Sequence, residues 1–177
     1  MRLAALAILV VLPLSAQEPS FPKPTPHHES MKAMVGTWDV TIKVAMGQGK
    51  PPLVSKGTET CRLLRGDLWL QEDFTSEFMG TPFETRRLFG YDPAKGMHVG
   101  AWVDSLATAP SHLQGTCKDG CREVTWTFDA LGMKGTPVSY KNVAVQKDAD
   151  HRTLTMYTKG ADGTFVQGME MEYTRRK

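Results

Sequence analysis

The chain has 177 residues, of which 41% are hydrophobic and 23% charged, with 21 basic against 19 acidic side chains. This length and apolar content indicate a single folded domain and exclude a disordered chain. The formal net charge of +2 is too small to indicate a nucleic-acid partner.

The first sixteen residues have the pattern of a secretory signal peptide. Arg2 gives a positive start, an apolar run extends from Leu3 to Leu14, and Leu14-Ser15-Ala16 offers small residues for cleavage. The run is shorter than the roughly 20 apolar residues that a membrane-spanning helix needs. We therefore expect an exported protein, periplasmic or secreted, with no transmembrane segment in its mature form.

A proline-rich segment follows the predicted signal peptide. Proline fixes φ and removes a hydrogen-bond donor, so residues 17–27 are predicted as a semi-rigid linker and residues 28–177 as the folded domain. A short helix is predicted over 27–35, because Met31 and Met34 have helical spacing there.

From Gly36 onward the hydrophobic period changes to two. Trp38, Val40 and Ile42 alternate with polar residues, which is typical of a half-buried strand. The predicted strands are 37–45, 54–63, 68–78, 83–89, 97–104, 111–117, 121–128, 138–146, 152–159 and 164–175, separated by turns rich in Gly, Pro and Asp. They indicate an all-β, antiparallel, up-and-down barrel of about ten strands with a short N-terminal helix at one end. A flattened half-barrel and a β-sandwich are the alternatives.

The start of the first strand resembles the G-x-W motif of lipocalin-like barrels, with Gly36 and Trp38 at the two fixed positions. The resemblance implies that Trp38 plugs the closed end of the barrel and that an arginine from the last strand packs across it. Arg175 has the same parity as the apolar Tyr173, so we expect Arg175, and not Arg176, to make this contact.

A longer pattern resembles a bacterial exported domain-of-unknown-function family, number fifteen-seventy-nine. The segments that carry it are VGTWDV (35–40), SKGTET (55–60), FMGTPFE (78–84), LFGYDP (88–93), AWVDS (101–105), LTMY (154–157) and MEMEYTRRK (169–177). The resemblance covers about residues 30 to 177 and implies a lipocalin-like, calycin-type barrel in an exported protein. The family has no agreed activity, and the cysteine pair at 117 and 121 is a departure from its pattern.

The two ends of such a barrel differ in composition. Twenty turn residues at the end of Trp38 carry nine charged side chains, whereas thirty at the opposite end carry four. The less charged end is predicted to be the mouth. Its apolar rim would include Met46, Met79, Leu106 and Met133, which suits apolar ligands or partners of variable shape. The alternative is that these side chains tuck inward.

The faces of the strands can also be assigned. If Cys117 pairs with Cys121 across their turn, His112 faces Trp126 and both point inward. The lumen is then predicted to be lined by His98, Trp102, Asp104, His112, Gln114, Trp126 and Phe128. An aromatic wall with a few polar groups is typical of a ligand cavity, and Asp104 would anchor a polar group. Alternatively, these side chains simply fill a narrow barrel.

The cysteines favour structural roles. Cys117 and Cys121 flank a short turn at a spacing that suits a hairpin disulfide, and Cys61 is left as a buried free thiol.

The sequence has no characteristic spacing of metal ligands, so no metal and no cofactor are expected. Asp104, Ser105 and His112 are the residue types of a hydrolase triad. Because adjacent strand residues face opposite sides, Asp104 and Ser105 cannot both face His112. No catalytic residue is therefore predicted.

The sequence favours binding of a small, mostly apolar molecule in the barrel lumen. The alternative is a cell-envelope module that binds a protein partner through the methionine-rich rim. A haem-type binder or an enzyme that uses His98 or His112 is the third hypothesis.

Overall fold

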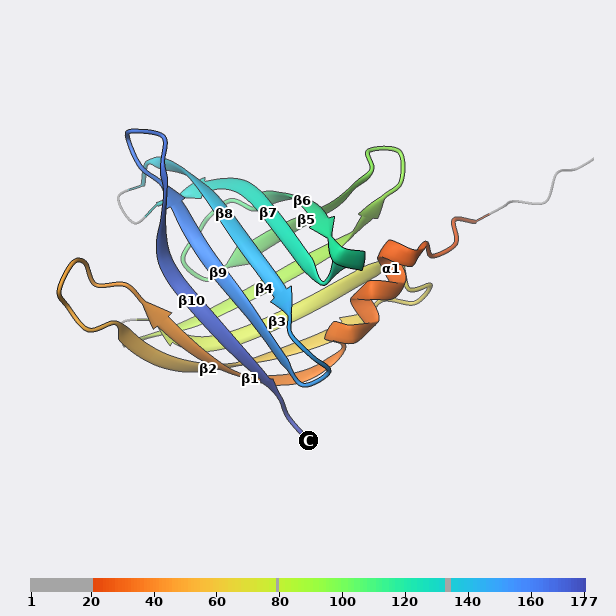
Figure 1. The fold of residues 1–177 in the computed structure, drawn as a ribbon, viewed down its shortest axis with the longest axis horizontal. Coiled ribbons are helices and arrows are strands. Elements are labelled where there is room, and N and C mark those ends of the chain that lie inside the picture. The colour runs from red at the N-terminus through yellow and green to blue at the C-terminus, as the bar shows by residue number, and fades with distance from the viewer. Residues whose placement is uncertain (1–20, 79, 133–134) are drawn as a thin grey trace, which may run out of the picture.

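The computed structural model describes residues 21–78, 80–132 and 135–177. Within them, ten antiparallel strands follow one another around a closed barrel, because β1 pairs with both β2 and β10 (Figure 1). The prediction of an up-and-down barrel is confirmed, and the sandwich and half-barrel alternatives are wrong. The predicted signal peptide, together with Met79 and Met133 of the predicted rim, lies outside the described residues.

The element boundaries follow the predicted strands closely. An α-helix, α1 (Pro26–Ser30), continues into a 3₁₀ helix, η1 (Met31–Met34), and a second 3₁₀ turn, η2 (Asp119–Cys121), joins β6 to β7. The strands are β1 (Gly36–Val44), β2 (Leu53–Leu63), β3 (Trp69–Phe78), β4 (Thr81–Asp92), β5 (Met97–Asp104), β6 (Ser111–Lys118), β7 (Glu123–Leu131), β8 (Pro137–Gln146), β9 (His151–Lys159) and β10 (Phe165–Arg175). The largest departure is β4, which is longer at both ends than the predicted 83–89.

Side-chain alternation decides which face of each strand is buried. In β1, Trp38, Val40 and Ile42 are buried inside the barrel while Asp39 is exposed. The same period of two continues into β10, whose Tyr173 pairs with Val40 and is also buried. The apolar core therefore lies inside the barrel.

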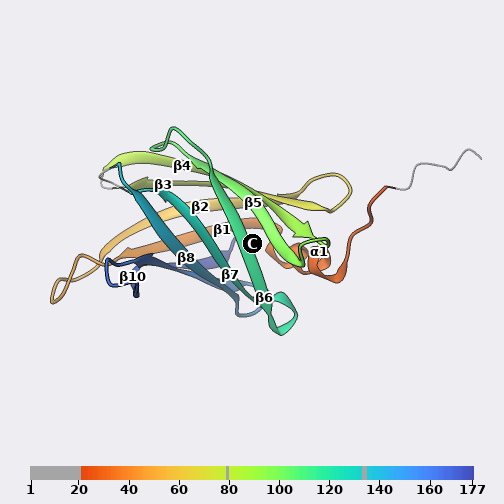
Figure 2. The same ribbon diagram turned by 90° about the horizontal axis from the view of Figure 1, so that it is seen from above.

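The helical segment lies at one end of the barrel (Figures 1 and 2). Trp38, at the same end, is completely buried. The indole Nε1 of Trp38 donates a hydrogen bond to the carbonyl oxygen of Met34 at 2.8 Å. The guanidinium carbon of Arg175 lies 4.1 Å from the centre of the Trp38 ring, and that of Arg152 lies 4.6 Å from it. Cation–π contacts of this kind stabilise a buried indole.

Arg175 also fixes the end of η1. Its Nη1 donates to the carbonyl of Val35 at 2.5 Å and its Nη2 to that of Ala33 at 2.7 Å. These carbonyls belong to the last turn of the helical segment, where a cation is favourable. The neighbouring Arg176 instead reaches Asp39 on the outer face. One arginine thus links the last strand, the helix end and Trp38.

The register of β6 and β7 differs from the predicted one. Cys117 pairs with Val124, and Cys121 belongs to the turn η2 rather than to the facing strand. This shift by an odd number of residues reverses the faces of β6, so His112 and Gln114 are exposed on the outside. Their predicted place in the lumen is wrong, because the connection through η2 is longer than a tight hairpin. The inward residues are Ser111, Leu113 and Gly115.

Candidate ligand-binding site in the barrel lumen

A layer of buried charged side chains crosses the barrel interior. Arg87 donates to Glu72 through Nε at 2.5 Å and through Nη2 at 2.7 Å. Arg152 donates to Glu59, and both of these side chains are less than 8% exposed. Four strands supply these residues: β2, β3, β4 and β9. We call Glu59, Glu72, Arg87 and Arg152 the charged layer.

Burial changes the acid–base properties around this layer. Desolvation raises the pKa of the Glu72 carboxyl, and the charge of Arg87 opposes this effect. Burial, together with the nearby Glu59, raises the pKa of the Cys61 thiol. Cys61 is a free, buried cysteine, so the predicted free thiol is confirmed. A thiol that resists ionisation is a poor nucleophile.

A cavity of about 230 Å³, which we call the lumen cavity, lies on the mouth side of the charged layer. Its floor is formed by Glu59, Glu72, Arg87, Asn142 and Tyr173. Its walls are mainly aromatic, aliphatic and thioether side chains, with a few polar ones: Ile42, Phe74, Phe78, Phe83, Trp102, Leu154, Met156, Met169 and Met171, together with Ser55, Ser76, Glu77 and Thr85. The cavity is therefore amphipathic, with the buried ion pairs at its floor and mostly apolar side chains above them.

Asn142 is the unsatisfied group in this cavity. The side chain is only 7% exposed, and its Oδ1 has no hydrogen-bond partner among the residues that the structure describes. Leaving a buried polar group unpaired costs about 1–3 kcal/mol.

A second hollow of about 320 Å³ lies nearer the mouth. Trp102 and Met156 line both hollows, so these two side chains stand between them. Asp104 lines only the outer one, and its Oδ1 accepts a hydrogen bond from the backbone N–H of Leu106 at 2.8 Å. Asp104 thus organises the β5–β6 turn. Phe128 is buried and packs edge-on against Trp102, with ring centres 5.6 Å apart, but it lines neither hollow.

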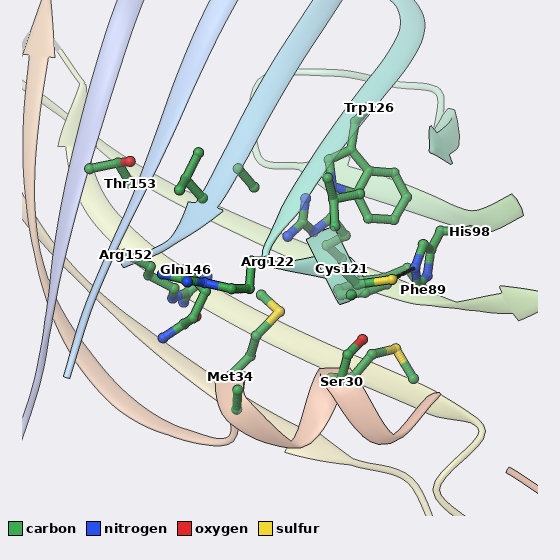
Figure 3. A pocket seen from close by; sticks show the side chains of 17 residues that line it. Ser30, Met34, Phe89, His98, Cys121, Arg122, Trp126, Gln146, Arg152 and Thr153 are labelled. Carbon is green, nitrogen blue, oxygen red and sulfur yellow. Dashed lines mark hydrogen bonds between the residues drawn. The ribbon is translucent and has the colours of Figure 1, made fainter. Parts of the chain in front are cut away.

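A third pocket, of about 220 Å³, lies at the closed end between the helical segment and the charged layer (Figure 3). His98 and Trp126, both 2% exposed, line this pocket together with Cys121. Burial, with a smaller effect of the nearby His27, lowers the pKa of His98 to about 4. His98 and Trp126 point into the barrel as predicted, but they lie below the lumen cavity.

The predicted lining is thus divided among three places. Trp102 borders the lumen cavity, whereas Asp104 lies at the mouth and His98 and Trp126 lie at the closed end. Sequence reasoning missed the charged layer and Asn142. A signal was present, since the adjacent Glu72 and Asp73 cannot both point outward from a strand. Sequence alone does not show which arginine would meet an inward acid.

Among the residues that the structure describes, two groups of side chains have donor atoms close enough to share a metal ion. One comprises Glu59, Cys61 and Glu72, whose two carboxylates are already paired with arginines of the charged layer. The other group lies at the closed end.

The rim of the mouth exposes apolar side chains, as predicted for Met46 and Leu106. Met46 is 44% exposed and Leu106 is 57% exposed. Further exposed apolar residues near this end are Leu53, Val54, Leu131, Phe165 and Val166. They lie around the mouth, which leads to the second hollow and to the lumen cavity.

The disulfide between Cys117 and Cys121 is confirmed, with the Cα atoms 4.7 Å apart. Such a bond is compatible with an oxidising compartment. None of the helices in the described ranges has the length and apolar character needed to cross a bilayer.

Fold and site together define a lipocalin-like barrel: a closed ten-stranded antiparallel meander with a plugged end and an amphipathic interior cavity. The chain belongs to the family described as "Protein of unknown function (DUF1579)", whose family model matches residues 23–175. The resemblance stated from the sequence is confirmed.

Solved structures share the fold at low identity. The chain is similar to the crystal structure of Rv2717c from M. tuberculosis, with 10% identity, a TM-score of 0.62, and coverage of 86% of this chain and 99% of that chain. A redesigned β-barrel matches with 13% identity and a TM-score of 0.46, covering 88% of this chain and 100% of its own. A search of curated proteins finds no match. At these identities the structural likeness concerns the fold alone.

Proposed function

We propose that the protein binds a small amphipathic molecule in the lumen cavity. The polar group of the ligand faces the floor, and its apolar part lies among the aromatic and methionine side chains of the wall. The observation that carries this proposal is the buried Asn142, whose Oδ1 lacks a partner and which lines a cavity. A bound N–H or O–H group removes the cost of that unpaired oxygen.

The cavity volume limits the size of the ligand. An apolar cavity of about 150 Å³ accommodates benzene. The 230 Å³ of the lumen cavity therefore suits a molecule of one or two rings, or a short branched chain, with one polar end. A rotation of Trp102 would join this cavity to the outer hollow and admit a longer ligand.

The charged and polar residues at the floor of the cavity favour a ligand whose polar group lies next to them. Because Glu72 and Arg87 are already paired, the ligand needs no full charge to compensate them. A neutral hydroxyl, phenol or amide group is the best complement to Asn142. We place this binding outside the cytoplasm, in keeping with the signal peptide predicted from the sequence and with the Cys117–Cys121 disulfide.

Native mass spectrometry of the mature protein from its own envelope is the first test. Solvent extraction of any added mass then identifies the ligand class. We expect a small adduct that is lost in Asn142→Leu and retained in His112→Ala, whose altered side chain lies on the outer face. A bare monomer mass, with no quenching of tryptophan fluorescence by phenols, amides or fatty acids, would contradict the proposal.

The exposed rim supports a second candidate, a protein-interaction module of the cell envelope. Val54 and Val166 are 55% and 61% exposed near the mouth, which is a high exposure for large apolar side chains. A rim partner should be lost in the double variant Val54→Lys/Val166→Lys while lumen binding persists. Loss of lumen binding without loss of the partner in Asn142→Leu would separate the two functions.

A further inference from the structure

Four metal-ligating side chains meet at the closed end of the barrel. The donor atoms of His27, His98, Cys117 and Cys121 all lie within 4.8 Å of one another. His27 Nδ1 is 3.1 Å from Cys121 Sγ and 3.4 Å from Cys117 Sγ. Cys121 Sγ is 3.8 Å from His98 Nε2, and Figure 3 shows these two side chains pointing toward each other. We call these four residues the Cys–His cluster.

Four different elements supply the cluster. His27 comes from α1, His98 from β5, Cys117 from the end of β6 and Cys121 from η2. His27 and Cys121 are 94 positions apart in the sequence. No local spacing motif could therefore reveal the cluster, and the expectation of no metal site rested on such motifs. Packing of α1 against the barrel end brings the donors together.

Tyr91 orients both imidazoles. The ring of His27 stacks on that of Tyr91 with centres 4.0 Å apart, and the ring of His98 packs edge-on against it at 5.3 Å. The aromatic contacts thus hold one nitrogen of each histidine toward the sulfurs. A cluster whose ligands are oriented by neighbouring packing resembles the supported donor sets of metal sites.

The donor set has a definite chemical preference. Two cysteine sulfurs and two imidazole nitrogens form the tetrahedral set that Zn²⁺ takes in structural sites. A disulfide sulfur does not supply the thiolate that such a site requires. We infer that the Cys–His cluster is a redox-gated zinc site, which holds one Zn²⁺ when Cys117 and Cys121 are reduced and none when they form their disulfide.

The two states interconvert by balanced thiol chemistry. A dithiol reductant gives two electrons and two protons to the Cys117–Cys121 bond and becomes a disulfide itself, leaving two free thiols. Zn²⁺ then replaces the two thiol protons, and His27 and His98 contribute nitrogen lone pairs. A disulfide oxidant that takes two electrons back reforms the S–S bond and releases the metal.

The partial exposure of the cluster allows Zn²⁺ and thiol reagents to reach it from solvent. His27, Cys117 and Cys121 are only half-buried, whereas His98 is 2% exposed and forms the base of the cluster. Zinc at this place would tie α1 to β5 and β6 and so close the pocket of Figure 3 on one side. The site is separate from the lumen cavity, so this inference does not depend on the proposed ligand.

Metal titration of the reduced and oxidised mature protein tests the inference. Zn²⁺ is titrated in competition with a chromophoric chelator, and Co²⁺ serves as a spectroscopic probe. We expect one Zn²⁺ per reduced chain and none per oxidised chain, with Co²⁺ giving tetrahedral d–d bands and thiolate charge transfer. His27→Ala should weaken zinc binding by about 100-fold, since even the loss of an outer-shell partner costs 10- to 100-fold. The matched control His112→Ala should bind as the wild type does.

The comparison of redox states needs no substitution, so it stands even where a variant folds poorly. Far-UV circular dichroism checks the fold of each variant. Equal zinc binding by the reduced and the oxidised wild type would overturn the inference. So would an octahedral Co²⁺ spectrum, or an unchanged zinc affinity in folded His27→Ala.

Discussion

Two inward-facing tryptophans, Trp38 and Trp102, show how differently the two ends of the barrel are built. Trp38 is completely buried, hydrogen-bonded to Met34 and in contact with two arginines. Trp102 is half-buried between two hollows. Both follow the same strand alternation. The α1–η1 segment covers Trp38, whereas no helix in the described residues covers Trp102.

The comparison shows that the two ends surround their tryptophans with different kinds of contact. The closed end uses directional contacts, namely cation–π pairs, carbonyl hydrogen bonds and buried ion pairs. The open end has the lumen cavity, the second hollow, the unpaired Oδ1 of Asn142 and exposed apolar residues, whereas the hollow at the closed end is the pocket beside the helical segment. Natural proteins commonly give up stability at functional sites.

Trp38→Ala should give the largest loss of stability, about 4–5 kcal/mol in the free energy of unfolding, because it leaves a cavity in the closed end. Trp102→Ala should cost less than half of this, since its side chain is only partly buried and already borders two hollows. Chemical denaturation measures the free energy of unfolding of both variants. An equal loss in the two variants would remove the distinction between the ends.

Arg87→Met should lower the free energy of unfolding by about 3 kcal/mol at neutral pH, because Glu72 would remain buried without its partner. Burial raises the pKa of Glu72, so the loss should shrink as the pH falls and the carboxyl is protonated. The double variant Arg87→Met/Glu72→Leu should recover most of the stability. A double variant as unstable as the single one would show that the ion pair is not the cause.

His98 makes stability depend on pH. Its pKa is about 4 in the folded protein against an ordinary value of 6.5, so between these values the unfolded chain binds a proton that the folded chain excludes. Stability should therefore fall as the pH decreases from about 6.5 to 4, by up to about 3 kcal/mol. Urea unfolding at several pH values measures the slope. His98→Gln should flatten it and His112→Gln should not, and the reverse pattern would contradict the assignment.

The neighbouring arginines at the end of β10 test the contact on Trp38. Arg175→Gln should cost about 1–2 kcal/mol, because it removes a cation–π contact and two hydrogen bonds to the end of η1. Arg176→Gln breaks an exposed pair with Asp39 and an exposed hydrogen bond to Thr58, and should cost less than about 1 kcal/mol. Thermal unfolding compares them, and equal shifts in Tm would argue against the closing role of Arg175.

Asn142→Leu should change the stability of the ligand-free protein least, by about 0–1 kcal/mol, and in the stabilising direction. The reason is that the substitution removes a buried oxygen without a partner and adds apolar volume to the cavity. The same variant should lose about 10-fold in affinity for a lumen ligand with an N–H or O–H group. A large destabilisation would show that Asn142 has a structural role at the open end.

Much of the fold could be predicted from the sequence, and less of the site. The ten strands, their order and the inward direction of Trp38, Trp102 and Trp126 follow from alternation. The outward direction of His112 does not, because it depends on a turn that is longer than the cysteine spacing suggested. A change in the length of one turn that shifts the register by an odd number of residues moves every side chain of the strand to the opposite face.

The sequence by itself determined the β-rich, meandering barrel, because a period of two is a local property that each strand carries independently. Only the tertiary structure decided that Glu59 meets Arg152 and that His27 meets the two cysteines. These residues are separated by about ninety positions, and nothing local specifies their approach. Closure of the barrel and the packing of α1 across its end bring them together, and with them the chemistry of the interior.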